Sequence, residues 1–217
     1  MDQPEQLEKL CLKDMPATDT TVVMPEVLSP LNTFTNLRAL SLCFEQDREA
    51  SFANKPIIGK PKSVANLLRD LSSIRRLKAF KLHCVPSDNE QALALALKDF
   101  IAQNKNLNEL CFGSTYPQFP GPDLQSVCNV RPMQRLQLTN FGCTSIAFLN
   151  TEKLETLSFK GGILALPAMH NALKASRLRD LCFRELMMSE EALTVFPLSQ
   201  IQSLAFSNFS PANIMHL

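Results

Sequence analysis

The sequence predicts an α/β fold in which about eight short parallel strands form one curved sheet, with helices packed on its convex side. Two observations predict it. An apolar pattern recurs eight times along the 217 residues, and segments with helical spacing of apolar residues separate several of its copies. A unit of one strand and one return segment cannot bury its own apolar face, so we expect stacked units to share one core.

The recurring pattern is an apolar residue, two variable residues, an apolar residue, one variable residue and a third apolar residue. Its copies begin at Leu7, Leu37, Leu77, Leu107, Met133, Leu154, Leu178 and Ile201. The alternation in the second half of each copy has the period of a strand with one buried face. We therefore expect one strand in each copy.

Helical returns are expected between the longer-spaced copies. Ser87 and Glu90 are spaced as a capping box, and Ser189 is placed as the N-cap of a further helix containing Leu193 and Phe196. The two clearest apolar stripes are Val64, Leu67, Leu68, Leu71 and Ile74, and Leu93, Leu97, Phe100 and Ile101.

This arrangement, from Leu7 to Phe209, resembles the leucine-rich-repeat family, and its longer units resemble the irregular, ribonuclease-inhibitor-like type. The resemblance implies a right-handed solenoid that binds other proteins. Similar proteins include bacterial effectors acting inside host cells, substrate-receptor subunits of ubiquitin ligases and sensor regions of immune receptors.

The chain departs from that family at the ninth position of each copy, where the family usually has asparagine or cysteine in a turn. We expect packing to fill the turn here instead, because five of the eight residues at this position are apolar. They are Met15, Glu45, Val85, Thr115, Phe141, Gly162, Leu186 and Phe209.

We expect a single repeat domain over residues 1–217, either a complete protein or part of a longer one. Neither end shows a capping unit. The segments 45–62 and 113–122 are rich in proline, glycine or charge and predict loops at the edge of the sheet. These loops are either binding elements or tolerated insertions.

Composition indicates a soluble protein: 45% of the residues are hydrophobic, 20% are charged, and the net charge is +1. Neither a secretory signal nor a membrane span is visible. The seven cysteines form no CxxC pair, which argues against a disulfide framework and a zinc site. We expect a cytoplasmic location, or host-cell cytoplasm for a secreted effector. We expect no cofactor, no metal and no nucleic-acid or membrane binding; the oligomeric state is left open.

The third, fifth and seventh residues of each copy point away from the core and form three columns across the sheet. Six of them are basic and two are acidic, so this concave face predicts a partner protein with an acidic surface; a chance charge bias is the alternative. The candidate partner-binding residues are Lys9, Lys13, Lys81, His83, Glu109, Arg135, Lys160, Asp180 and Arg184.

Catalytic chemistry has one candidate, Cys43 and His83, which share a column in neighbouring copies and so resemble a Cys–His dyad. The open face offers no oxyanion hole or orienting group, and Gly161-Gly162 is expected in a turn without a phosphate-loop motif. We therefore expect a non-enzymatic protein-interaction module. The alternatives are the recognition part of a ubiquitin-ligase-type enzyme or an immune receptor, and a purely architectural role.

Overall fold

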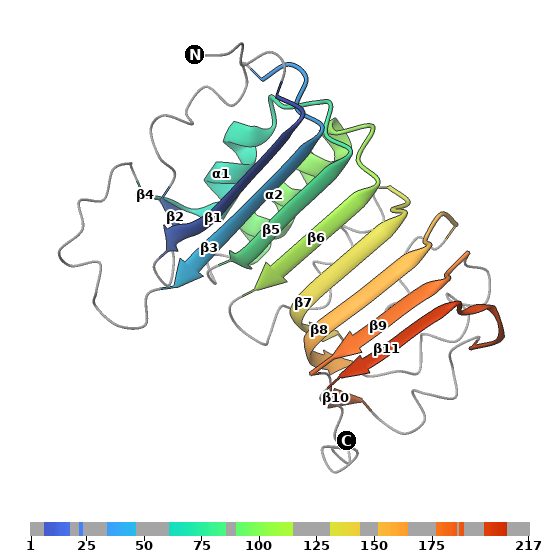
Figure 1. Ribbon diagram of the computed structural model, residues 1–217. Coiled ribbons are helices and arrows are strands. Elements are labelled where there is room, and N and C mark those ends of the chain that lie inside the picture. The colour runs from blue at the N-terminus through green and yellow to red at the C-terminus, as the bar shows by residue number, and fades with distance from the viewer. Residues whose placement is uncertain are drawn as a thin grey trace.

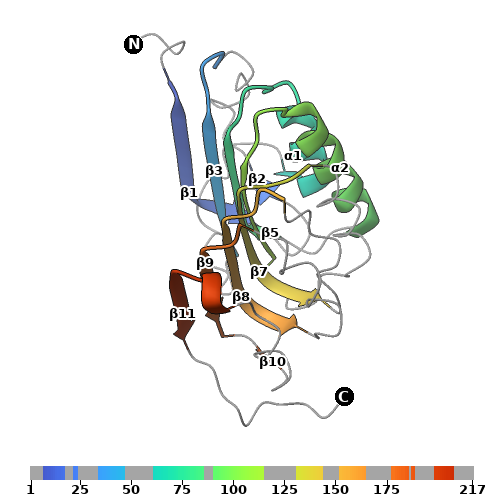
Figure 2. The ribbon, with the colours of Figure 1, turned by 90° about the vertical axis from the view of Figure 1, so that its right-hand side faces the viewer.

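The structure is a computed structural model that describes residues 7–17, 22–23, 34–46, 61–85, 90–114, 131–143, 152–164, 177–185, 187–188 and 198–207. Within these ranges the protein is an α/β fold with one open sheet and two α-helices (Figure 1). Both helices lie on the same side of the sheet (Figure 2). The predicted fold class is thus confirmed at the level of a parallel sheet with helices on one face.

Eight strands run parallel and lie in the sheet in the order of the chain. Each begins at the third residue of one apolar copy, so the eight predicted strands are confirmed. They are β1 (Lys9–Ala17), β3 (Ala39–Gln46), β5 (Ala79–Val85), β6 (Glu109–Ser114), β7 (Arg135–Cys143), β8 (Thr156–Leu164), β9 (Asp180–Arg184) and β11 (Ser203–Ser207).

Three two-residue strands extend this sheet. Strand β2 (Val22–Val23) pairs antiparallel with the end of β1, and β4 (Pro61–Lys62) pairs antiparallel with β2. Strand β10 (Met187–Met188) pairs with the end of β8.

The same backbone hydrogen bonds join neighbouring copies of the pattern. At the first junction, the carbonyl of Glu8 accepts from the N–H groups of Arg38 and Ala39, at 2.8 and 3.0 Å. The equivalent pair recurs at every junction up to the last, where the carbonyl of Arg179 accepts from Gln202 and Ser203. This recurrence fixes the register and sets equivalent residues of successive strands side by side.

The two helices are α1 (Val64–Leu71) and α2 (Glu90–Gln103), and both predicted stripes are buried. The Ser63 side chain caps α1 by accepting from the N–H of Asn66 at 3.3 Å, a cap that the sequence analysis did not single out. The rings of Phe80 on β5 and Phe100 on α2 lie 4.5 Å apart, which ties the helix to the sheet.

Ser87 and the segment from Ser189 to Phe196 lie outside the described residues. A 3₁₀ turn, Leu198–Gln200, leads into β11.

The core lies between the sheet and the helices and continues along the strands towards β9. It is formed by the buried stripes of the two helices and by the first, fourth and sixth residues of the six copies that begin between Leu37 and Leu178, as the period of a half-buried strand requires, while Leu7, Leu10 and Leu12 of the first copy are partly buried. Phe159 and Phe183 stack in it with ring centroids 6.0 Å apart. Burial ends at the last strand, where Leu204 is 44% exposed although its neighbour Leu181 on β9 is 1% exposed.

One sequence prediction is wrong: the ninth position is not generally a turn. The strands continue through it in five copies, because their ladders pair further than the apolar pattern does, as in Phe141↔Gly162. These five residues are Met15, Glu45, Val85, Phe141 and Gly162. Gly161-Gly162 accordingly lies inside β8 instead of after it, with Gly161 at a φ of 67°. Thr115, Leu186 and Phe209 lie outside the described residues.

In the part of the chain that the structure describes, no helix combines the length and apolar character needed to cross a membrane. The predicted loops fall mostly outside the described residues, in 47–60 and 115–122.

Candidate functional site

The open face is the surface of the eight parallel strands that turns away from α1 and α2 (Figure 2). The predicted columns lie on it: the register places Lys9 beside Ala39, Ala39 beside Ala79, and so on through Ser203. All nine candidate partner-binding residues belong to strands of this face. The sequence therefore predicted correctly that these residues lie on one face of the sheet.

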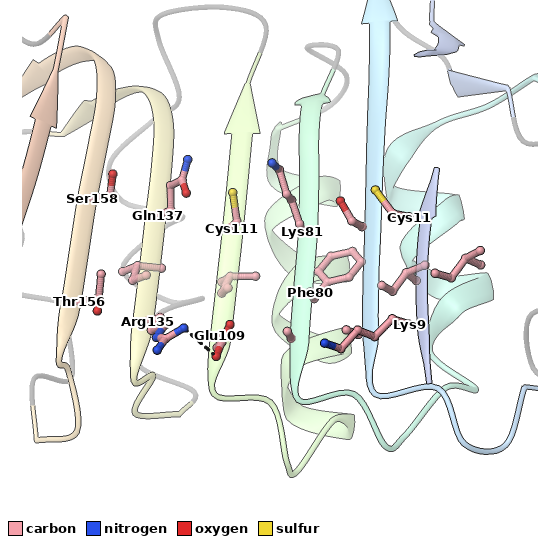
Figure 3. A pocket seen from close by; sticks show the side chains of 17 residues that line it. Lys9, Cys11, Phe80, Lys81, Glu109, Cys111, Arg135, Gln137, Thr156 and Ser158 are labelled. Carbon is pink, nitrogen blue, oxygen red and sulfur yellow. Dashed lines mark ion pairs between the residues drawn. The ribbon is translucent and has the colours of Figure 1, made fainter. Parts of the chain in front are cut away.

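A hollow of about 460 Å³ runs over the first two columns from β1 to β8. Figure 3 shows these columns as two rows, with Lys9, Glu109, Arg135 and Thr156 in one and Cys11, Lys81, Cys111, Gln137 and Ser158 in the other. Small side chains such as Ala39 and Ala79 leave the space between the longer ones. The hollow therefore follows from small side chains that lie beside longer ones in these columns.

The two acidic residues of the three columns, Glu109 and Asp180, are both paired within the first column. Arg135 Nη1 lies 3.4 Å from Glu109 Oε1 on the adjacent strand (Figure 3), and Thr156 Oγ1 donates to Asp180 Oδ2 at 3.2 Å. With Lys9, this column holds two basic and two acidic residues and has no net charge.

The net positive charge of the three columns comes entirely from the second and third columns. Their four cations are Lys13, Lys81, Lys160 and Arg184, and no Asp or Glu occupies either column. Among the described residues none of the four has an ion pair. Lys9 in the first column also has no ion pair among the described residues, whereas Arg135 is paired with Glu109.

Two of the candidates lie at irregularities of the ladder. The pairing of β1 with β3 shifts between Leu12 and Met15, and that of β5 with β6 shifts between Leu82 and Val85. Lys13 and His83 fall inside these shifts. A bulge disturbs the regular ladder, so Lys13 has no regular partner on β3 and His83 has none on β6, although His83 stays beside Cys43 on β3.

The bulge in β5 directs the ring of His83 over Gly113 on β6. An added Cβ at Gly113 would lie 2.6 Å from His83 Nδ1 and 3.2 Å from the Cβ of Thr139 on β7. Gly113 and Thr139 are buried, and His83 is half-buried. The middle of the third column is consequently tightly packed, and less of the His83 side chain is accessible to a partner than the sequence suggested.

His83 Nδ1 and Thr139 Oγ1 are both buried and have no hydrogen-bond partner among the described residues. Burial lowers the pKa of His83, and the nearby charges of Lys81 and Lys160 lower it further. The ring is therefore neutral at neutral pH.

The Cys43–His83 pair is adjacent in the register, as the columns predicted. The hydrogen bond described for Cys43 is to Ser41 instead, with Sγ and Oγ 3.9 Å apart, while His83 Nδ1 has no partner. A nucleophilic dyad needs the imidazole to accept the thiol proton, and Nδ1 does not do so in this arrangement.

Four cysteines with described side chains are free thiols: Cys11, Cys43, Cys111 and Cys182. Burial raises the pKa of Cys111 to about 11, against a smaller opposing effect of Lys81. Its sulfur is therefore protonated at neutral pH and acts as a small apolar group in the wall of the hollow. Among the described residues, no cluster of His, Cys, Asp or Glu is arranged to hold a metal ion.

Sequence reasoning missed Gly113 and Thr139, which decide where His83 lies. The available signal was the single glycine in a column of larger residues, between His83 and Thr139.

Comparison of the chain with family models, with curated proteins and with solved structures gave no match.

Proposed function

We propose that this protein is a non-enzymatic recognition module whose open face binds an acidic surface of a partner protein. The observation that carries the proposal is the separation of charge on that face. Four cations without described ion pairs occupy the second and third columns, beside a hollow of about 460 Å³. A rigid sheet presents them at fixed spacing, which lowers the entropy lost on binding.

The proposal extends to the architecture. The recurring junction hydrogen bonds and the common register support a solenoid of the leucine-rich-repeat type, with right-handed coils. The four free cysteines on the open face favour a cytoplasmic setting, or the host cytoplasm for a bacterial effector.

The surroundings of Cys111 and His83 favour recognition over catalysis. Cys111 holds its proton up to a pKa of about 11, and His83 packs its Nδ1 against Gly113. Neither is poised as a nucleophile or a base.

The test is a quantitative pull-down from eukaryotic cell lysate with the full chain and two variants of equal charge change. The open-face variant carries Lys81→Gln, Lys160→Gln and Arg184→Gln. The control variant carries Lys62→Gln, Arg69→Gln and Lys98→Gln, of which Arg69 and Lys98 lie on α1 and α2 and Lys62 on β4 is ion-paired with Asp70 of α1.

Proteins captured by the parent and the control, but lost from the open-face variant, are the expected result. Direct titration of one such protein should then show a loss of about 1–3 kcal/mol, since exposed pairs contribute up to about 1 kcal/mol each. A captured set that is the same for all three chains would contradict the proposal.

A further inference from the structure

The turns that lead into the parallel strands form a second surface, which we call the strand-entry rim. It lies along one edge of the sheet, at the tail ends of the arrows in Figure 1. Its residues are 7–8, 34–38, 74–78, 104–108, 131–134, 152–155, 177–179 and 198–202.

The rim is strongly basic although the whole chain is not. It contains nine Lys and Arg residues against three Glu, a balance of +6, whereas the full chain carries +1. This excess is not apparent along the sequence, because each of six separate turns contributes only one to three cations. Folding brings them to a single edge.

The rim cations are exposed and mostly unpaired. Eight of the nine are exposed, and the half-buried one is Arg131. Arg38 lies 3.8 Å from Glu8, and Arg131 Nη1 donates to the carbonyl of Asn104 at 2.7 Å. The remaining seven have no ion pair among the described residues: Arg75, Arg76, Lys78, Lys105, Lys153, Arg177 and Arg179.

The spacing of the turns lets these charges act together. Neighbouring strands of a sheet lie about 4.8 Å apart, which is less than the screening length of roughly 8 Å at physiological salt. An anion at one turn therefore interacts with the cations of the adjacent turns as well.

Part of the rim is a shaped hollow as well as a charged edge. A cavity of about 380 Å³ lies at the entries of β6 to β9, with Arg131, Lys153 and Arg177 in its lining. Its floor is held by a chain of side-chain hydrogen bonds: Asn108 donates to Gln134 at 3.4 Å, and Gln134 donates to Glu155 at 2.9 Å. Three cations and one carboxylate, Glu155, thus line the hollow, which gives it a net charge of +2.

We propose that the strand-entry rim binds an acidic segment of a protein, rich in Asp and Glu, with one carboxylate seated in this hollow. The inference goes beyond the open face and does not require that face to bind anything. The long arginine and lysine side chains of turns about 4.8 Å apart can reach carboxylates on an extended chain, which rises about 3.3 Å per residue.

A nucleic acid fits the rim less well than an acidic protein segment does. A phosphodiester backbone repeats its charge at every nucleotide, whereas a protein segment rich in Asp and Glu can place neutral residues opposite the rim carboxylates Glu8, Glu152 and Glu155. Base stacking needs exposed aromatic faces, and the only aromatic residue of the rim, Phe34, is half-buried against the core. An acidic protein can place its carboxylates between these positions.

The test is fluorescence anisotropy with a labelled oligoglutamate peptide and the full chain. The rim variant carries Lys105→Gln, Lys153→Gln and Arg177→Gln, all exposed and without described ion pairs. The open-face variant Lys81→Gln, Lys160→Gln, Arg184→Gln has the same charge change, and far-ultraviolet circular dichroism checks that both remain folded.

We expect the rim variant to bind about eightfold more weakly, since each exposed ion pair contributes roughly a factor of two, and the open-face variant to change less than about twofold. Equal losses in the two variants would overturn the rim site, as they would reflect net charge alone. A loss confined to the open-face variant would also overturn it, while leaving the proposed function in place.

The last binding measurement uses a labelled oligothymidylate. We expect it to bind the parent chain more weakly than oligoglutamate of equal charge. Tighter binding that is lost in the rim variant would overturn the proposal of an acidic protein segment in favour of nucleic acid.

Discussion

Replacing Gly113 by alanine probes the tight packing in the middle of the third column. The added Cβ would lie 2.6 Å from His83 Nδ1, where ordinary contacts begin near 3.4 Å, and 3.2 Å from the Cβ of Thr139. Thr139 is buried and offers little room, so the ring of His83 must move out of its place.

The expected cost follows from two opposing effects. Overpacking of this kind costs about 1–3 kcal/mol, while alanine loses less backbone entropy than glycine on folding, a gain of about 0.4–1 kcal/mol. That gain is available because Gly113, unlike Gly161, is not described with a positive φ. We expect a net loss of about 1–2 kcal/mol in the free energy of unfolding.

A double-mutant cycle tests whether His83 is the residue that the methyl group added by Gly113→Ala overlaps. In a His83→Ala background the nearest contact is gone, so Gly113→Ala should be neutral or slightly stabilising. The coupling between the two positions should then be about 1–3 kcal/mol.

Urea unfolding followed by far-ultraviolet circular dichroism is the suitable assay, because the chain has no tryptophan and one tyrosine. The reasoning fails if Gly113→Ala is as stable as the parent while His83 is present. It also fails if the two substitutions are simply additive.

Three further predictions follow. Leu42→Ala should cost about 2–5 kcal/mol in urea unfolding and Leu204→Ala less than about 1 kcal/mol, because Leu42 is fully buried and Leu204 is 44% exposed; equal costs would contradict the core described. The pKa of His83 is lowered from its usual 6.5, so the unfolded chain binds the proton more readily and stability should fall as pH drops below 6.5; His83→Gln should reduce that fall in a pH series. Cys111, with a pKa of about 11, should react with iodoacetamide far more slowly at pH 8 than exposed Cys11, and mass spectrometry showing equal labelling would contradict its burial.

The sequence by itself determined the strands, the buried side of each and the residues of the open face. Side chains alternate along a strand, so the apolar copies at Leu37, Leu107 and Leu178 fixed which neighbours face the core, and each strand begins two residues after its copy starts. The buried stripes of α1 and α2 were likewise predictable from the sequence, because helical periodicity depends only on residues that are close together in the chain.

Only the tertiary structure decided how far the strands run, where Lys13 and His83 lie, and which charges are neutralised. Strand length and bulges depend on pairing with a neighbour some twenty or more residues away, as for Phe141 and Gly162 or the shift beside His83. Glu109 is neutralised by Arg135, whose place beside it comes from the register. The rim cations were visible as single residues, but their gathering at one edge is a property of the stack, because no short segment contains more than a few of them.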